Sequence, residues 1–329
     1  MQKIKGIVKI SSKGTLLLLS IISLFIVPLL GERYIVYLMA HVLLLALFAT
    51  SYNLLFGYSG LLSFGHAGLF AVGAYTCGLI INHIVPSTIL AIIGGTAFTA
   101  IVSTGIGYLC TKYTRIYFAM LTLAFGMFIY AIVWKWYPVT RGDDGLGGII
   151  RSPIEIPGIF KFNLEPLENY YYFILIVFLL SMIILYQIVR SPFGLILQGI
   201  RENDERIEFA GISARKYRFI AFIISGTFSG LTGALYGPLE TLVAPSSAHW
   251  TKSAEPLLAT LLGGSSIFIG PTIGALLFII IKDIIIRFTE FWLIWFGLIL
   301  LGLVMGMRGG VALFFQRVIE ARFGKKVIS

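Results

Sequence analysis

The amino-acid sequence predicts an all-α polytopic membrane protein, with about ten transmembrane helices in two inverted five-helix repeats that contain interrupted helices. Hydrophobic residues make up 58% of its 329 residues and charged residues only 12%, whereas soluble domains contain about 25% charged residues. The apolar runs continue for about 20 residues, as membrane-spanning helices require, and do not alternate as barrel strands do. One run in each half is broken by Gly, Ser or Pro, which favours inverted repeats.

The net charge of +10 and the two cysteines fit this class. The basic residues are distributed in short segments between apolar runs, which is typical of orientation signals and of contact with anionic lipid, and not of nucleic-acid binding. Cys77 and Cys110 both fall inside apolar runs. Their number and spacing predict neither a disulfide framework nor a metal site.

Ten apolar runs, with the residues that break them, predict the spans in order. The first run follows Lys3, Lys5, Lys9 and Lys13 and resembles a signal peptide. No small-residue cleavage site follows it, so we expect a retained span. The predicted spans are 15–31, 35–56, 60–82, 88–110, 116–136, 170–189, 217–239, 254–265, 267–288 and 291–307.

The distribution of lysine and arginine predicts the orientation of these spans, because both residues collect in cytosolic segments. If the N-terminus is cytosolic, 17 of the 25 lysines and arginines lie in cytosolic segments and five lie in external ones. We therefore expect both termini on the cytosolic side. The long connection 137–168 is then external, and its four prolines predict ordered loop in place of a long helix.

Two segments interrupt the apolar pattern, 57–68 and 254–275. Residues 254–264 would extend only about 16 Å as a helix, which is too short for a hydrocarbon core of about 30 Å. Interrupted helices are tolerated at membrane depth only where they are buried in protein or line a wet cavity. The two segments, one in each half of the chain, therefore indicate a central pathway between the repeats.

Polar residues surround both interruptions and are candidates for a translocation pathway, because a polar solute needs transient hydrogen-bond partners. Alternatively, small polar residues allow helices to approach closely. A hydrogen bond at a helix start and a proton relay both stay open for His66. Asp283 and Arg287, four residues apart, are expected to pair on one helix face. The pathway candidates are Asn53, Ser59, Ser63, His66, Thr260, Ser265 and Ser266.

The hydrophilic segment 190–218 is longer than a passive connection needs to be. Ser191 and Pro192 form a helix start, in which the serine can cap and the proline fits the first turn. Gly211 suits a helix end with positive φ and is expected to separate two short helices. Isoleucines at near-helical spacing predict a face that packs on the bundle, and the mixed charge suits a polar groove in a partner protein. These isoleucines are Ile196, Ile200 and Ile207.

Enzyme motifs are absent from the sequence: it contains no G-x-S-x-G, no H-E-x-x-H and no paired intramembrane aspartates. It also contains no G-x-x-x-x-G-K-[ST], the loop that cradles nucleotide phosphates. We therefore predict a transport subunit without catalytic activity or a cofactor of its own. Any energy from ATP must reach it through another polypeptide, and segment 190–218 is the one cytosolic feature large enough to receive it.

Four stretches of the chain closely resemble permeases of branched-chain amino acid ABC importers, of the LivM type. The longest is IRENDERIEFAGISARKYRFIAFIISGTFSGLTGALYG, at 200–237. The others are YNLLFGYSGLLSFGHAGLFAVGAY at 52–75, TRGDDGLGGI at 140–149 and LLGGSSIFIGPTIGALL at 261–277. The resemblance runs from about residue 35 to 310 and implies a bacterial-type cytoplasmic (inner) membrane protein. It also implies the import of leucine, isoleucine, valine or a related solute.

The resemblance implies partners as well: a LivH-like sister permease, two cytosolic ABC ATPases that bind ATP and magnesium, and an extracytoplasmic solute-binding protein. Segment 190–216 would couple to the ATPases. Two other functions stay open, an ion-coupled secondary transporter and an ABC permease for amides or urea. In the external loop, Arg141 stands where the family pattern leads us to expect glycine. The implied coupling residues are Arg201, Glu202, Asn203, Glu205 and Gly211, and the implied docking loop contains Gly142, Asp143, Asp144 and Gly145.

Overall fold

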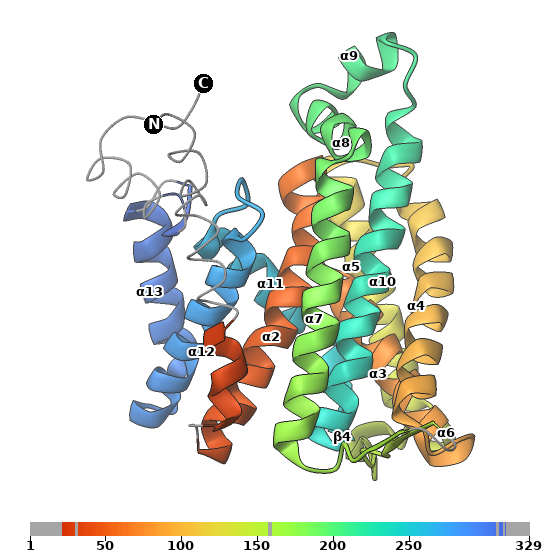
Figure 1. Ribbon diagram of the computed structural model, residues 1–329. Coiled ribbons are helices and arrows are strands. Elements are labelled where there is room, and N and C mark those ends of the chain that lie inside the picture. Colours follow the sequence, from red (N-terminus) through yellow and green to blue (C-terminus); the bar gives the residue numbers. More distant parts are fainter. Residues whose placement is uncertain (1–21, 30–31, 157–159, 307–308, 312, 314–329) are drawn as a thin grey trace, which may run out of the picture.

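A computed structural model of the protein describes residues 22–29, 32–156, 160–306, 309–311 and 313. Its regular structure is almost entirely helical, which confirms the predicted all-α class, and most helices run side by side in one bundle (Figure 1). The predictions for residues 1–21 and for the C-terminal residues 314–329 lie outside the described residues. Residues 22–29, at the end of the first predicted span, are helical.

The main helices follow the predicted spans closely. Five of them, α4, α5, α7, α10 and the continuous stretch Arg33–Tyr58, are long and apolar enough to cross a membrane. The predicted span 60–82 starts too early, because α3 begins only at His66, and α11 starts four residues before the predicted 254. The bounds are α2 Arg33–Asn53, α3 His66–His83, α4 Thr88–Cys110, α5 Arg115–Lys135, α7 Leu167–Arg190, α10 Ala214–Glu240, α11 Trp250–Gly263, α12 Gly270–Phe288 and α13 Trp292–Gly306.

Helices α2 and α10 form the centre of the bundle. In their most apolar windows, 67% and 56% of the residues are buried inside the protein, against 28–33% for α4, α5 and α7. The outer helices expose large apolar side chains, such as Ile101, Ile116 and Ile183. Such side chains suit contact with lipid acyl chains, so α4, α5 and α7 present the bundle's surface to the bilayer.

Glycines allow α3, α4 and α10 to pack with their backbones in contact. A Cβ atom at Gly233 would overlap the backbone carbonyl of Phe70, and one at Gly73 would overlap the carbonyl of Gly230. Gly230 in turn faces the side chain of Thr99 on α4. In a bilayer, where hydrophobic burial between helices supplies little drive, such close packing is a main source of association energy.

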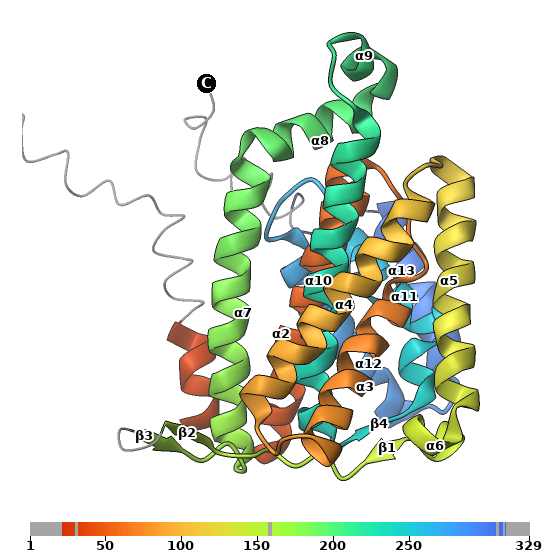
Figure 2. The same ribbon diagram turned by 90° about the vertical axis from the view of Figure 1, so that its right-hand side faces the viewer.

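The connection between α5 and α7 is mostly irregular, as its prolines predict, with two short helical turns, α6 Tyr137–Thr140 and η2 Gly142–Asp144. The sequence did not predict its strands. Strand β1 (Leu146–Gly147) pairs antiparallel with β4 (Leu242–Val243), in the register Leu146↔Val243. Strands β2 (Ile154–Ile156) and β3 (Phe160–Phe162) form a hairpin. These elements lie together at one end of the bundle (Figure 2).

Arg151 fixes this connection to the end of α10. Its guanidinium donates to the carbonyls of Pro238 (2.8 Å) and Leu239 (3.0 Å), and to that of Glu165 on the other side (3.2 Å). A cation here satisfies carbonyls that a helix C-terminus leaves without partners.

At the opposite end, α8 (Pro192–Glu202) lies across the bundle and α9 (Asp204–Phe209) projects beyond it (Figure 2). Pro192 occupies the first turn as expected, but the Ser191 hydroxyl donates back to the carbonyl of Ile188 and does not cap α8. The break between the two helices falls at Asn203 and not at Gly211. Asn203 accepts a hydrogen bond from the backbone N–H of Arg206 (2.9 Å), which is the cap that starts α9. Gly211 follows α9 with φ of +81°.

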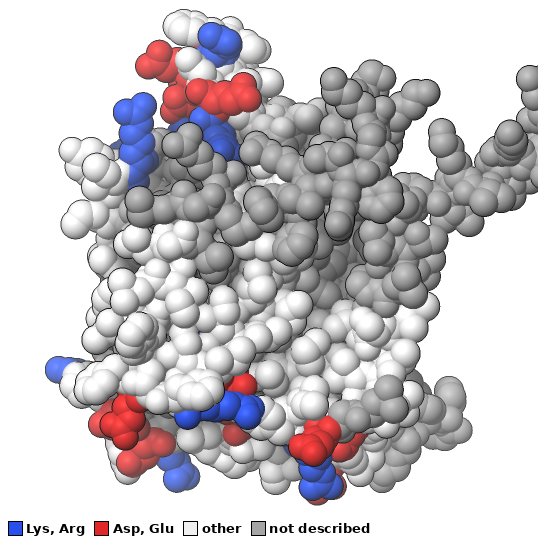
Figure 3. All heavy atoms as spheres, turned by 90° about the vertical axis from the view of Figure 1, so that its left-hand side faces the viewer, with Lys and Arg blue, Asp and Glu red and all other residues white. Residues whose placement is uncertain are grey.

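The charged side chains of the described residues gather near the two ends of the molecule on the face drawn in Figure 3, and the band between them is free of such residues. This distribution is what a bilayer requires, because an isolated charge at the depth of the hydrocarbon core is costly.

The glycine contacts predict that Gly233→Ala destabilises the protein strongly, because the added methyl group meets backbone that cannot rotate away. The expected cost is about 3 kcal/mol, measured as a lower midpoint of thermal unfolding in detergent. Gly105→Ala is the matched control, since no atom lies within 4 Å of its added Cβ. Equal stability of the two variants would contradict the close packing of α3 and α10.

Candidate functional site

Both predicted interruptions are present. Helix α2 continues into a π-helical turn, η1 (Leu54–Tyr58), after which residues 60–65 are not helical until α3 begins at His66. Helix α11 ends at Gly263, and α12 begins at Gly270. Gly264 has φ of +102°, a conformation that favours glycine.

The two interruptions contact each other. The Asn53 side-chain amide donates to the carbonyl of Ser265 (3.2 Å). Gly57 permits this approach, because a Cβ atom there would lie 2.7 Å from the same carbonyl oxygen and would overlap the Asn53 side chain. Two predicted pathway residues that are 212 positions apart therefore meet at one junction.

His66 connects the first interruption to α10. Its Nδ1 lies 2.8 Å from the Ser63 hydroxyl and its Nε2 lies 2.9 Å from the Ser225 hydroxyl, and the ring is fully buried. The Ser225 hydroxyl donates to the carbonyl of Ser51 (2.7 Å), so it accepts from Nε2–H. The Ser63 hydroxyl then donates to Nδ1. A neutral imidazole satisfies every one of these groups, which favours the structural hydrogen bond over the proton relay.

The remaining pathway candidates either donate a hydrogen bond to a carbonyl of their own helix or are partly or fully exposed. The Ser59 hydroxyl donates to the carbonyl of Leu55 (2.8 Å), and the Thr260 hydroxyl donates to that of Pro256 (2.7 Å). Ser265 is half-buried and Ser266 is exposed. Their role in translocation stays a prediction, as it does for Asn53 and His66.

Arg201 links the hydrophilic segment to the first interruption. Its guanidinium donates from α8 to the carbonyl of Gly57 in the π-helical turn. Gly60, with φ of +73°, leaves room for the arginine stem, because a Cβ there would lie 3.1 Å from Arg201 Cγ. The Arg201 side chain of α8 therefore donates a hydrogen bond to a backbone carbonyl of the π-helical turn that ends α2.

The rest of the hydrophilic segment is divided between a packed and an exposed side. Leu197 and Ile200 are buried in the bundle, and Ile196 and Ile207 pack against the same cluster, as the isoleucine spacing predicts. The charged residues Glu202 and Glu205 are exposed, as is Asn203, which caps α9.

An ion pair fixes α9 to the start of α10. Arg218 Nη2 lies 2.7 Å from Asp204 Oδ2. This hydrogen bond holds the pKa of the Asp204 carboxyl below its ordinary value. The pair is therefore present at neutral pH and is lost only as the pH falls through that lowered pKa.

In the connection between α5 and α7, left-handed backbone at Arg141 explains why the family pattern leads us to expect glycine there. Arg141 has φ of +59°, and Gly142 and Gly145 have φ of +54° and +75°. Any side chain other than hydrogen is strained there. The neighbouring Asp143 and Asp144 are exposed, as a docking loop requires, although docking itself stays a prediction.

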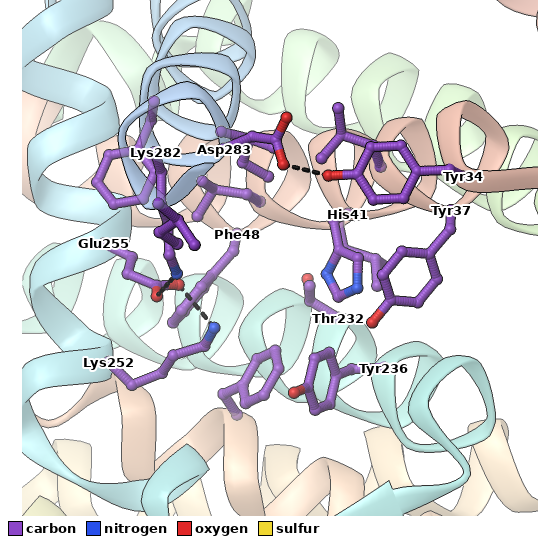
Figure 4. A pocket seen from close by; sticks show the side chains of 17 residues that line it. Tyr34, Tyr37, His41, Phe48, Thr232, Tyr236, Lys252, Glu255, Lys282 and Asp283 are labelled. Carbon is purple, nitrogen blue, oxygen red and sulfur yellow. Dashed lines mark hydrogen bonds and ion pairs between the residues drawn. The ribbon is translucent and has the colours of Figure 1, made fainter. Parts of the chain in front are cut away.

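A cavity of about 380 Å³ lies between α2, α3, α10, α11 and α12. Among the residues that the structure describes, its lining includes none of the seven predicted pathway residues. Figure 4 shows Lys252, Glu255 and Lys282 on one side, and aromatic residues with His41 on the other. These residues are the part of the site that sequence reasoning missed.

The charges at the cavity are paired both within α11 and across helices. Glu255 lies 2.6 Å from Lys252 Nζ and 3.6 Å from Lys282 Nζ. His41 Nε2 lies 2.7 Å from Glu240 Oε1, to which the Tyr37 hydroxyl also donates (2.7 Å). Sequence analysis singled out neither Glu240 nor Glu255. The sequence signal for the pair in α11 was a glutamate three residues after Lys252, a spacing that brings two side chains to one helix face.

Asp283 and Arg287 pair as predicted, with Nη2 3.0 Å from Oδ2. Asp283 also lines the cavity, where it accepts a hydrogen bond from the Tyr34 hydroxyl.

An apolar helical bundle with interrupted helices, a polar cavity and a projecting hydrophilic segment defines a membrane permease. The chain belongs to the family described as "Branched-chain amino acid transport system / permease component", whose profile matches residues 34–307. Membership of this family makes the chain a permease component of a transport system, and its long apolar helices fit a multi-pass membrane protein.

Curated relatives support this membership. The chain is 25% identical over 266 residues to the high-affinity branched-chain amino acid transport system permease protein LivM of Escherichia coli, covering 74% of this chain and 62% of that protein. The chain is 24% identical to LivM of Salmonella typhimurium, and the match again covers 74% of this chain and 62% of that protein. The guanosine ABC transporter permease protein NupQ of Bacillus subtilis is 29% identical over 92 residues, 28% of each chain. No solved structure matches the chain.

The His66 network predicts that His66→Ala removes one hydrogen-bond partner from each of two buried serine hydroxyls, Ser63 and Ser225, and leaves a cavity in their place. The expected loss is about 3 kcal/mol of unfolding free energy, seen as a lower thermal midpoint in detergent. His83→Ala is the matched control, because His83 lies exposed at the other end of the same helix. A His66→Ala variant as stable as the control would refute the structural role.

Proposed function

We propose that the chain is the permease subunit of an ABC importer that moves leucine, isoleucine and valine into the cytosol. It forms the pathway with a LivH-like sister permease, takes its energy from two cytosolic ATPases that bind ATP and magnesium, and receives solute from an extracytoplasmic binding protein. Support comes from the family, from the LivM relatives and from the absence of a phosphate-binding loop in the sequence.

The proposed topology has ten spans in two inverted five-helix repeats, with both termini in the cytosol. The first repeat ends with α5 and the second consists of α7, α10, α11, α12 and α13. Helices α8 and α9 then lie on the cytosolic side, and β1–β4 lie outside. The distribution of lysine and arginine supports this orientation, since 17 of 25 fall on the side of α8 and α9.

The contact of Arg201 with the Gly57 carbonyl carries the proposal for coupling. Helix α8 is the element that the ATPases would move. A π-helical turn interrupts the regular hydrogen-bond pattern of an α-helix and is frequent at functional sites, so it is a point at which α2 can change its path. A charge-assisted bond from α8 to that turn transmits displacement of α8 directly to the interrupted helix.

Exposed charges of α8 and α9 supply the contact surface for an ATPase. Glu202, Glu205 and Arg206 lie on the projecting part, and Leu197 and Ile200 fix its other face to the bundle. A segment that is anchored on one face and polar on the other can receive force without unfolding.

A second candidate function is an ion-coupled secondary transporter, which the partly buried carboxylates Glu240 and Glu255 beside the cavity favour. The full chain, reconstituted alone into liposomes, distinguishes the two. Solute accumulation under a proton or sodium gradient without ATPases would support the second candidate and refute the first.

The coupling proposal predicts that Arg201→Gln lowers leucine uptake by the assembled importer about tenfold or more, the equivalent of one charge-assisted hydrogen bond. Charge reversal by Arg201→Glu or Glu205→Arg abolishes uptake. The amount of protein in the membrane and the ATPase activity of the complex stay near their original values, because force transmission is lost and nucleotide binding is not.

Arg190→Gln is the matched control for this experiment. Arg190 is exposed at the end of α7, where its guanidinium lies over the Tyr186 ring, 4.6 Å from the centroid. Uptake by Arg201→Gln equal to that of Arg190→Gln would count against the coupling role of α8.

A further inference from the structure

The cavity between α2, α10, α11 and α12 combines charge of both signs with a large apolar surface. We infer that it is a binding site for a zwitterionic aliphatic α-amino acid, whose carboxylate binds at Lys252 and whose ammonium binds at His41. The choice of solute rests on the proposed function. The charges and the volume come from the cavity itself.

The lysine side of the cavity recognises a carboxylate. Lys252 and Lys282 come from α11 and α12 and both approach Glu255. An ammonium group has three N–H donors, so a contact with Glu255 leaves Lys252 able to donate to a ligand. Its side chain is 24% exposed, hence partly removed from water, and charge interactions in such an environment are stronger than at the surface.

The opposite side of the cavity recognises an ammonium. In the neutral tautomer that donates from Nε2 to Glu240, His41 Nδ1 is an acceptor for an N–H group. The Glu240 carboxylate behind the ring makes this side negative. The ring of Tyr37 lies 4.6 Å from the His41 ring, and aromatic faces attract cations. Figure 4 shows this group across the cavity from the lysines.

Apolar side chains occupy the space between the two charged sides. Phe48 of α2 and Phe70 of α3 pack ring to ring at 5.3 Å, and they are the lining residues nearest in sequence to the first interruption. With Leu44, Leu45 and Phe278 they form a surface for an aliphatic side chain. The volume of about 380 Å³ lies in the usual range for small-molecule sites, about 300–1,000 Å³.

This chemistry discriminates between solutes. An uncharged nucleoside, amide or urea carries neither a carboxylate for Lys252 nor an ammonium for His41. A fatty acid or an amine would satisfy only one side. An aliphatic amino acid satisfies both sides and the apolar surface at once.

A cysteine-protection experiment on the full chain in lipid nanodiscs tests the site. Ile279→Cys places a reactive thiol in the cavity lining, and the native Cys77 and Cys110 are buried. We expect leucine to slow labelling by a cationic thiol reagent. The analogue without the amino group, 4-methylpentanoate, the analogue without the carboxylate, isoamylamine, and guanosine should give no protection. Protection by leucine that is matched by either analogue would overturn the inference, as would no protection by leucine.

Substitutions in the Ile279→Cys background test the assigned residues. Lys252→Met and His41→Phe should each raise the leucine concentration needed for half-protection about tenfold or more. Lys135→Met, at an exposed position on α5, and His83→Phe are the matched controls and should change it less than about twofold, as surface changes usually do. Equal concentrations for the cavity variants and their controls would overturn the assignment.

Uptake by the assembled importer separates failure of the site from failure of the proposed function. Leucine uptake without leucine protection in nanodiscs would overturn the site and leave the function standing. Absence of uptake of every branched-chain amino acid would refute the proposed function whatever the labelling result.

Discussion

Every backbone carbonyl of an interrupted helix inside a membrane needs a partner, because lipid supplies none. In this protein the carbonyl of Gly57 receives the guanidinium of Arg201, and the carbonyl of Ser265 receives the amide of Asn53. The first partner comes from the hydrophilic segment and the second joins the two halves of the chain. The need of these carbonyls for hydrogen-bond donors therefore helps to fix the positions of the hydrophilic segment and of the two interruptions.

Helix α10 connects the two functional regions. Arg218 near its start holds α9 through Asp204, and Glu240 at its end holds His41 beside the cavity. Its 27 residues extend about 40 Å as a helix. Glycines from Gly226 to Gly237 let the second half of α10 pack closely against α3 and α4.

The charged side chains at the cavity are partly removed from water, where an isolated charge would cost free energy. Each carboxylate there is paired with a cation or a hydrogen-bond donor from another helix. Because these pairs are made between elements, they depend on the relative positions of the helices. A ligand with both charges can replace part of this pairing, which gives the cavity a reason to prefer a zwitterion.

The sequence by itself determined the class of the protein, the bounds of most helices, both interruptions and the presence of the hydrophilic segment, because apolar length, glycine and proline act locally. It also indicated the Asp283–Arg287 pair, which helical spacing alone brings together. It could not find the break at Asn203, since the capping hydrogen bond to Arg206 competes with Gly211 for the same boundary. Only the tertiary structure decided that Arg201 reaches Gly57, that β1 pairs with β4, and that His41, Glu240, Lys252 and Glu255 converge around one cavity. These contacts join residues on separate elements, and spacing along a chain carries no information about which helices lie side by side.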